Sequence, residues 1–217
     1  MPGRLTSFVA AAILAACSSA AAADFSAEIA DQDGRPVANA VVTLVRGAQG
    51  GVPAAATRLS ANRLIDQRQE TFIPLVTILP RGGSVRFANN DRTMHQVYSF
   101  SPVKQFEFTL ADGQTTPAVV FDRTGIAAIG CNIHDGMIAY IFVTESPWTA
   151  LTGDDGKLQI ADVPAGDYNV EIWHPRLPPA TRPPSARLAV GTGPAALKTA
   201  LTLLPDRTGH RAHGGGY

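Results

Sequence analysis

The sequence predicts an all-β protein built from β-sandwiches, and three observations lead to this class. Apolar and polar residues alternate with the two-residue period of strands in segments such as 105–110 and 167–173. Turn signals such as Asp33-Gly34, Asp112-Gly113 and Asp155-Gly156 separate these segments. No long stretch carries the 3.6-residue apolar stripe of a helix, so strands and turns account for the pattern.

The composition limits the class of protein further. The chain has 217 residues, of which 45% are hydrophobic and 17% are charged, which is typical of a globular protein of one or two domains. Lys and Arg together number 18, as do Asp and Glu. This balance gives no charge-based reason to expect binding to nucleic acid or to an acidic membrane surface.

Residues 1–23 have the layout of a secretory signal peptide. Arg4 gives a positive start, residues 8–16 form an apolar run too short to span a bilayer, and Ala21-Ala22-Ala23 offers a small-residue cleavage site. We therefore expect a periplasmic protein that begins at Asp24 and has no transmembrane segment. An alternative stays open, because residues 14–17, Leu-Ala-Ala-Cys, resemble a bacterial lipobox with a lipid anchor at Cys17.

Two separated segments are similar to parts of one known sandwich. Residues 34–42 have the pattern Gly-x-Pro-x-x-x-Ala-x-Val, and residues 164–168 have the pattern Pro-x-Gly-x-Tyr. Both resemble the transthyretin-like or carboxypeptidase regulatory-like module. The resemblance implies a split domain, 24–47 with 146–204, in or next to which lies a second sandwich of residues 57–145. We expect residues 205–217 to be a disordered tail.

A single cysteine is left in the chain once residues 1–23 are removed. Cys131 lies in the segment 130–140, Gly-Cys-Asn-Ile-His-Asp-Gly-Met-Ile-Ala-Tyr, with His134 and Met137 at intervals of three. Residues 125–130 and 138–143 read as neighbouring strands, so the three side chains can converge on the loop between them. A lone thiol in an oxidising compartment is either buried or bound to a metal.

The residue types in this loop favour copper. A thiolate, an imidazole and a thioether are soft or intermediate ligands that suit Cu(I) and Cu(II), whereas zinc rarely takes methionine. A second histidine, His95, follows a strand at 85–88 and a polar turn at 89–91, and loops at one end of a sandwich meet. His95, Cys131 and His134 with a weak axial Met137 form the blue-copper pattern. Met94 is the less favoured axial candidate, because adjacent strand residues point to opposite faces.

At these residues the sequence resembles known copper proteins. The spacing Cys131-x-x-His134-x-x-Met137 is similar to the ligand loop of amicyanin, and Asn89-Asn90 before His95 resembles a turn of plastocyanin. The segments 72–91, 95–108, 130–143 and 170–177 are similar to the periplasmic methylamine utilization proteins, a cupredoxin-like family. The resemblance implies a Greek-key sandwich with one copper per chain at His95, Cys131, His134 and Met137, which carries single electrons between periplasmic redox partner proteins.

The sequence does not predict an enzyme. No carboxylate pair or Ser/His/Asp set is evident, the five histidines are too few for a multicopper oxidase, and a closed four-ligand site leaves no position for a substrate. A copper chaperone or storage protein and a metal-free interaction module remain the alternatives. We interpret His174 as structural, His210 and His213 as part of the tail, and Asp31, Asp33, Asp154 and Asp155 as turn residues.

Overall fold

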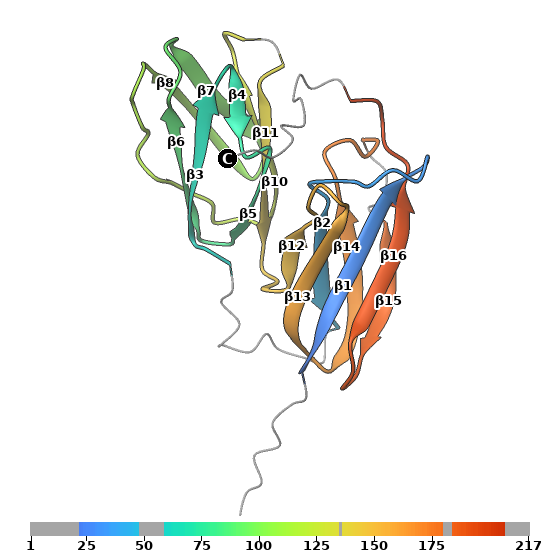
Figure 1. The fold of residues 1–217 in the computed structure, drawn as a ribbon. Helices are drawn as coiled ribbons and strands as arrows, with labels where there is room; N and C mark the ends of the chain where they lie inside the picture. Colours follow the sequence, from blue (N-terminus) through green and yellow to red (C-terminus); the bar gives the residue numbers. More distant parts are fainter. Residues whose placement is uncertain (1–21, 48–58, 135, 180–183, 207–217) are drawn as a thin grey trace, which may run out of the picture.

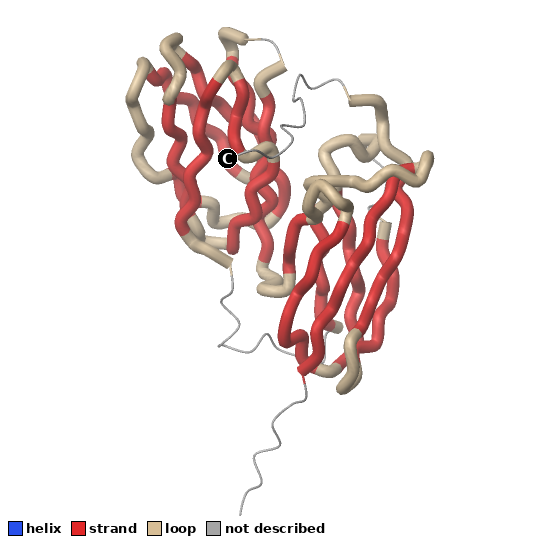
Figure 2. The backbone as a smooth tube through the Cα atoms, viewed as in Figure 1, coloured by secondary structure: helices blue, strands red, loops and turns tan. Residues whose placement is uncertain are grey.

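The computed structural model describes residues 22–47, 59–134, 136–179 and 184–206. Sixteen strands and the loops between them make up these residues, and Figure 2 shows no helix among them. In chain order the strands are β1 (Ala22–Asp31), β2 (Val41–Arg46), β3 (Asn62–Arg68), β4 (Thr71–Ile73), β5 (Val76–Pro80), β6 (Ser84–Asn89), β7 (His95–Ser101), β8 (Lys104–Leu110), β9 (Val119–Val120), β10 (Gly125–Cys131), β11 (Ile138–Thr144), β12 (Thr149–Leu151), β13 (Lys157–Pro164), β14 (Gly166–Trp173), β15 (Ser185–Val190) and β16 (Ala195–Leu201).

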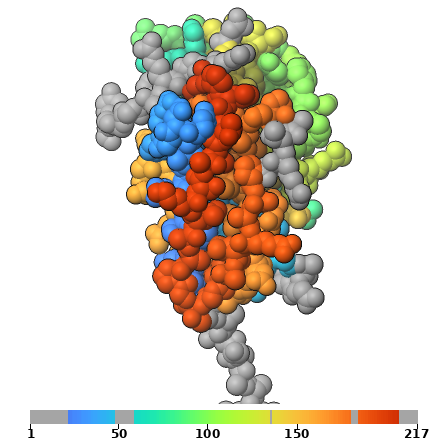
Figure 3. Space-filling view, turned by 90° about the vertical axis from the view of Figure 1, so that its right-hand side faces the viewer, coloured from blue at the N-terminus to red at the C-terminus, as the bar shows by residue number. Residues whose placement is uncertain are grey.

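The first sandwich joins the beginning and the end of the described chain. One of its sheets has the strand order β13-β1-β16 and the other β12-β2-β14-β15. β1 pairs antiparallel with β13 and parallel with β16, so the first and last strands lie side by side, as the blue and red atoms in Figure 3 show. Phe25, Leu44 and Val170 are fully buried in the core between the two sheets.

The second sandwich consists of the strands between β2 and β12 (Figure 1). Its five-stranded sheet has the order β5-β11-β10-β7-β8, and its four-stranded sheet has the order β4-β3-β6-β9. Phe87, Phe121, Ile129 and Ile141 are fully buried in its core. β10 pairs with β7 and β11, which places the ends of these strands at one end of the sandwich.

A smaller apolar cluster connects the two sandwiches. Trp173, at the end of β14, packs against Tyr140 and Phe142 of β11, with ring centroids 5.5 Å and 5.8 Å apart. Val41 of β2 and Val76 of β5 are fully buried in the same cluster. The sheet that carries part of the candidate site is therefore packed directly on the first sandwich.

The predicted all-β class with β-sandwiches is confirmed. The alternation expected at 105–110 is present, since Phe106, Phe108 and Leu110 are more buried than Gln105 and the other residues between them. Within the described residues, no helix is long and apolar enough to cross a membrane. The expected signal peptide lies outside the described residues except for Ala22 and Ala23. Cys17, the expected site of a lipid anchor, lies outside them, as do His210 and His213.

Candidate metal centre

Three potential ligands come together at one end of the second sandwich. His95 is the first residue of β7, Cys131 is the last residue of β10, and His134 lies in the loop between β10 and β11. The register of β7 and β10 pairs Cys131 with Val97, so the ends of these two strands lie side by side. Antiparallel pairing of these strands thus brings together residues that lie 36 positions apart in the sequence.

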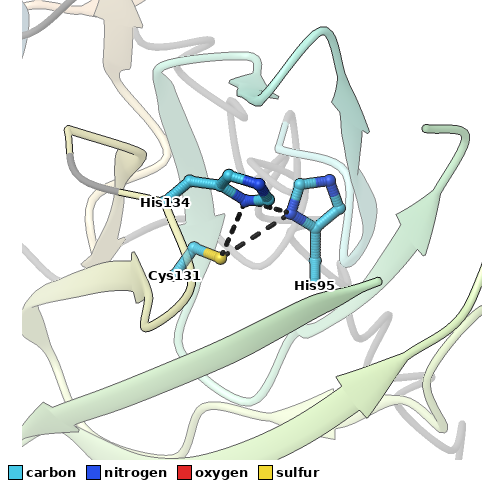
Figure 4. Close-up of side chains that lie close together, drawn as sticks. All are labelled: His95, Cys131 and His134. Atoms are coloured by element: carbon cyan, nitrogen blue, oxygen red, sulfur yellow. Dashed lines mark hydrogen bonds between the residues drawn. The ribbon is translucent and has the colours of Figure 1, made fainter. Parts of the chain in front are cut away.

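The ligand atoms of these residues point toward one another (Figure 4). The two Nδ1 atoms of His95 and His134 are 3.2 Å apart, and the Cys131 Sγ lies 3.6 Å from the first and 3.9 Å from the second. A tetrahedral metal with bonds of about 2.05 Å to nitrogen and about 2.3 Å to sulfur requires separations of about 3.3 Å and about 3.6 Å. The triangle therefore has the size and donor set that one first-row transition metal ion needs.

Burial separates this triangle from the surrounding water. The His95 side chain is fully buried, Cys131 is buried, and the His134 side chain is 20% exposed. The two Nδ1 atoms and the sulfur face one another away from solvent, and each can act as a metal ligand. A bound cation would satisfy all three atoms at once.

The two methionine candidates lie in different surroundings. Met137 is 5% exposed, belongs to the core cluster that contains Cys131, and lines a shallow groove together with Cys131 and His134. The Met94 side chain is 54% exposed. Of the two, Met137 has the burial that an axial ligand requires.

Each histidine ring has a carboxylate next to its other nitrogen. The Nε2 of His95 lies 2.8 Å from Oδ2 of Asp91, and the Nε2 of His134 lies 3.6 Å from Oε1 of Glu70. Burial tends to raise the pKa of Asp91, but hydrogen bonds from the Glu70 amide, the His95 ring and the Gln69 amide outweigh it and hold that pKa below its usual value. Asp91 is thus ionised at neutral pH and accepts a hydrogen bond from the Nε2–H of His95.

The loop before His95 is held by a buried amide. Asn89 is fully buried, and its Nδ2 donates to the carbonyl groups of Thr93 and Leu110 at 2.8 Å and 3.0 Å. Its Oδ1 accepts the backbone N–H of Asp91 at 2.9 Å. These bonds fix the path of the chain from β6 to His95, so Asp91 and His95 meet in a defined geometry.

Sequence reasoning did not find Asp91 or Glu70. Asp91 stands four residues before His95, and this spacing was the only available signal. Glu70 lies in the turn between β3 and β4, and its distance from His134 depends on how the two sheets pack.

The other candidates serve the fold. His174 is buried and accepts the backbone N–H of Arg176 on Nδ1 at 3.1 Å. Burial, with a smaller contribution from the charge of the nearby Arg176, lowers the pKa of His174 to about 4. Asp31 accepts backbone N–H groups of its own turn, and Asp155 does the same in a later turn. Among the described residues, His95, Cys131 and His134 are the one group of histidine, cysteine and acidic side chains close enough to share a metal ion.

Comparisons with known proteins add a limited finding. No protein-family model matches the chain, and no curated protein matches it. A copper-containing nitrite reductase from Thermus scotoductus SA-01 is 23% identical with a TM-score of 0.36, over 39% of this chain and 22% of that one. Amicyanin from Paracoccus versutus is 18% identical with a TM-score of 0.35, over 48% of this chain and 97% of that one. A purple cupredoxin from Nitrosopumilus maritimus is 19% identical with a TM-score of 0.31, over 48% of this chain and 97% of that one.

These values limit what the likenesses mean for this chain. All three identities are below 25% and all three TM-scores are below 0.5. The chain spans less than a quarter of the nitrite reductase, whose activity is a property of that protein. The residues and geometry of the His95, Cys131 and His134 triangle are therefore what supports a function.

Proposed function

We propose that this protein is a type 1 copper protein that carries single electrons between redox partner proteins. One observation carries the proposal, namely that the Nδ1 atoms of His95 and His134 and the Sγ of Cys131 form a triangle with sides of 3.2, 3.6 and 3.9 Å. Two imidazoles and a thiolate with a weak thioether are the donor set of blue-copper sites. Copper bound by this set supplies one-electron redox chemistry between Cu(I) and Cu(II).

The residues around the triangle suit electron transfer better than substrate turnover. His95 and Cys131 are held on paired strands, which keeps their donor atoms in one arrangement in both oxidation states. His134 reaches the surface with 20% of its side chain exposed, and its neighbour Ile133 is 47% exposed. Together with Met94, which is 54% exposed, Ile133 gives an apolar rim through which a partner protein can approach His134.

The proposal includes a place and a context for this reaction. We place the protein in the periplasm, in the cupredoxin-like methylamine utilization family, with one copper per chain and no enzymatic activity of its own. The order of Arg4, an apolar run and small residues before Asp24 supports export, and the motifs around His95 and Cys131 support the family. Cleavage after Ala23 would leave Asp24–Asp31 of β1 in place.

We further propose the division into a signal peptide at 1–23, a carboxypeptidase regulatory-like domain at 24–47 and 146–204, a copper domain at 57–145 and a tail at 205–217. The strand pairs β1–β13 and β2–β14 support the split, because they join the first segment to the last. Mass spectrometry of the exported protein tests its start. A chain that begins at Asp24 supports the signal peptide, and a diacylated Cys17 supports the lipid anchor instead.

Copper titration of the purified protein tests the function. We expect one copper per chain and an intense visible band from charge transfer between the Cys131 thiolate and Cu(II). The variant Cys131→Ser is expected to lose this band, because a hydroxyl cannot replace the thiolate. Copper that is bound without the band and passes quickly to a chelator favours a chaperone or storage protein. A protein that binds no copper favours a metal-free interaction module.

A further inference from the structure

The turn between β3 and β4 has an unusual backbone. Gln69 and Glu70 have φ values of 50° and 56°, in the left-handed region that residues with a Cβ rarely adopt. Two consecutive left-handed residues form the tight hairpin turn that Asn and Gly favour, and neither is present here. Such a backbone persists where surrounding groups hold it in place, and these positions concentrate at functional sites.

The group that holds this turn also contacts a candidate ligand. The two oxygens of Asp91 accept the backbone N–H groups of Gln69 and Glu70, the second at 2.9 Å. The oxygen that accepts the Glu70 N–H also accepts the Nε2–H of His95 at 2.8 Å. The Asp91 side chain is only 13% exposed, so water competes little for these bonds.

The same turn reaches the second histidine. The Glu70 carboxylate lies 3.6 Å from the Nε2 of His134, on the side of the ring opposite the triangle. His95 and His134 come from different loops and lie 39 positions apart in the sequence. The turn thus carries the carboxylate beside His134 and binds Asp91, which is the carboxylate beside His95.

We propose that the Gln69–Glu70 turn and Asp91 act together as a positioning clasp for both ligand histidines. The Asp91 carboxylate, 2.8 Å from the Nε2 of His95, fixes the proton there and leaves the Nδ1 lone pair free to bind the metal. The Glu70 carboxylate, 3.6 Å from the Nε2 of His134, favours the same protonation of that ring through its negative charge. Asp91 and Glu70 are positioning residues, because they act through the rings and do not touch the metal. This inference rests on the metal site of the proposed function and extends it to three residues outside the ligand set.

Substitution of Asp91 separates this role from a purely structural one. In Asp91→Asn a single amide oxygen remains to accept three N–H groups, so the clasp opens and the negative charge behind His95 is lost. Removal of such a partner weakens metal binding by about 10- to 100-fold. Glu70→Gln changes a carboxylate that is 60% exposed, so a smaller loss of affinity, under about 10-fold, is expected.

A matched control is available in the same hairpin. Asp66 accepts hydrogen bonds from the Gln67 N–H, the Arg68 guanidinium and the Asn90 amide, and none of these three donors is a histidine. Asp66→Asn removes one negative charge from the hairpin that carries the Gln69–Glu70 turn. We expect it to leave the affinity for copper and zinc within about twofold of the unmodified protein.

The experiment measures copper and zinc affinity by chelator competition in the three variants and the unmodified chain. It also records ¹⁵N NMR of the histidine rings in the metal-free and the zinc-loaded protein. We expect an Nε2–H signal for both His95 and His134. We expect the affinity for each metal to be highest in Asp66→Asn, lower in Glu70→Gln and lowest in Asp91→Asn. Equal affinities of Asp91→Asn and Asp66→Asn would overturn the clasp, as would a proton on Nδ1 of the metal-free His95.

The outcomes also separate the clasp from the metal site itself. If the unmodified protein binds neither metal, the proposed function fails. If it binds a metal and the variants bind equally well, only the clasp fails. Should Asp91→Asn not fold, Glu70→Gln and the ring signals of the unmodified protein decide, because the turn and the buried contacts of Asp91 are intact in both.

Discussion

Gly136 offers a test of how much the ligand loop depends on one backbone angle. Its φ is +85°, and a Cβ built there meets no atom within 4 Å. Gly136→Ala therefore introduces no clash and acts through the backbone alone, at a cost of about 1–2 kcal/mol for a left-handed residue with a Cβ. The bond that closes the loop, from the Cys131 N–H to the Met137 carbonyl, is long at 3.3 Å, so the loop can relax without metal.

Because the metal-free loop can relax, the free-energy cost of a left-handed alanine at position 136 destabilises mainly the metal-bound state. A loss of about 1–2 kcal/mol corresponds to a copper affinity lower by about 5- to 30-fold. Chelator competition measures this change, and Gly34→Ala is the control, since Gly34 has a φ of +79° with equally open space and lies in the first sandwich. The control is expected to lower the free energy of unfolding by a similar amount and to leave copper affinity unchanged. If Gly136→Ala binds copper within twofold of the unmodified protein, the loop geometry does not set the affinity.

Three further outcomes are expected. Met137→Gln should keep copper and lower the midpoint potential in voltammetry, because a harder axial donor favours Cu(II), whereas Met137→Leu should raise it; an unchanged potential in the Gln variant would exclude Met137 as the axial ligand. Gly156→Ala should lower the free energy of unfolding by about 2–5 kcal/mol in denaturant titration, since its φ is +72° and a Cβ there would lie 2.5 Å from the Ile29 carbonyl oxygen; a loss no larger than that of Gly34→Ala would contradict this clash. The pKa of His174 is lowered to about 4 in the folded protein, from an ordinary value of 6.5, so between these pH values the unfolded chain binds more protons than the folded one. The free energy of unfolding should therefore fall by about 1.4 kcal/mol per pH unit as the pH drops from 6.5 toward 4. His174→Gln should flatten this slope in denaturant titrations at several pH values.

Strand patterns proved readable from the sequence where one face of the strand is buried. In β14 the expected inward residues Tyr168, Val170 and Ile172 are buried, and Glu171 is exposed. Trp173 falls on the outward face of the same alternation, which is unusual for so large an apolar residue. It packs on Tyr140 of the other sandwich, and this contact depends on how the two sandwiches meet, which no local pattern contains.

The candidate site divides in a similar way. The intervals of three from Cys131 to Met137 and the turn before His95 indicated a ligand set, because soft donors at such spacing have few other uses. Glu70 carries no local signal, since its turn has no Gly or Asn and its φ of 56° is imposed by Asp91 from a distant loop. The contact of Glu70 with His134 depends on how the two sheets pack, so only the three-dimensional structure reveals it.

The parallel pairing of β1 with β16 has a consequence for the order in which the chain assembles. Phe25 pairs with Ala195, so β1 can pair with β16 only after nearly the whole of the described chain is available. The strands β3–β11 pair among themselves and can close earlier, while β1 is still without β13 and β16. Long-range pairings of this kind form slowly and leave strand edges exposed in the meantime. A chain that becomes available from its N-terminus onward would therefore complete the sandwich that holds His95 and Cys131 before the sandwich that holds its own first strand.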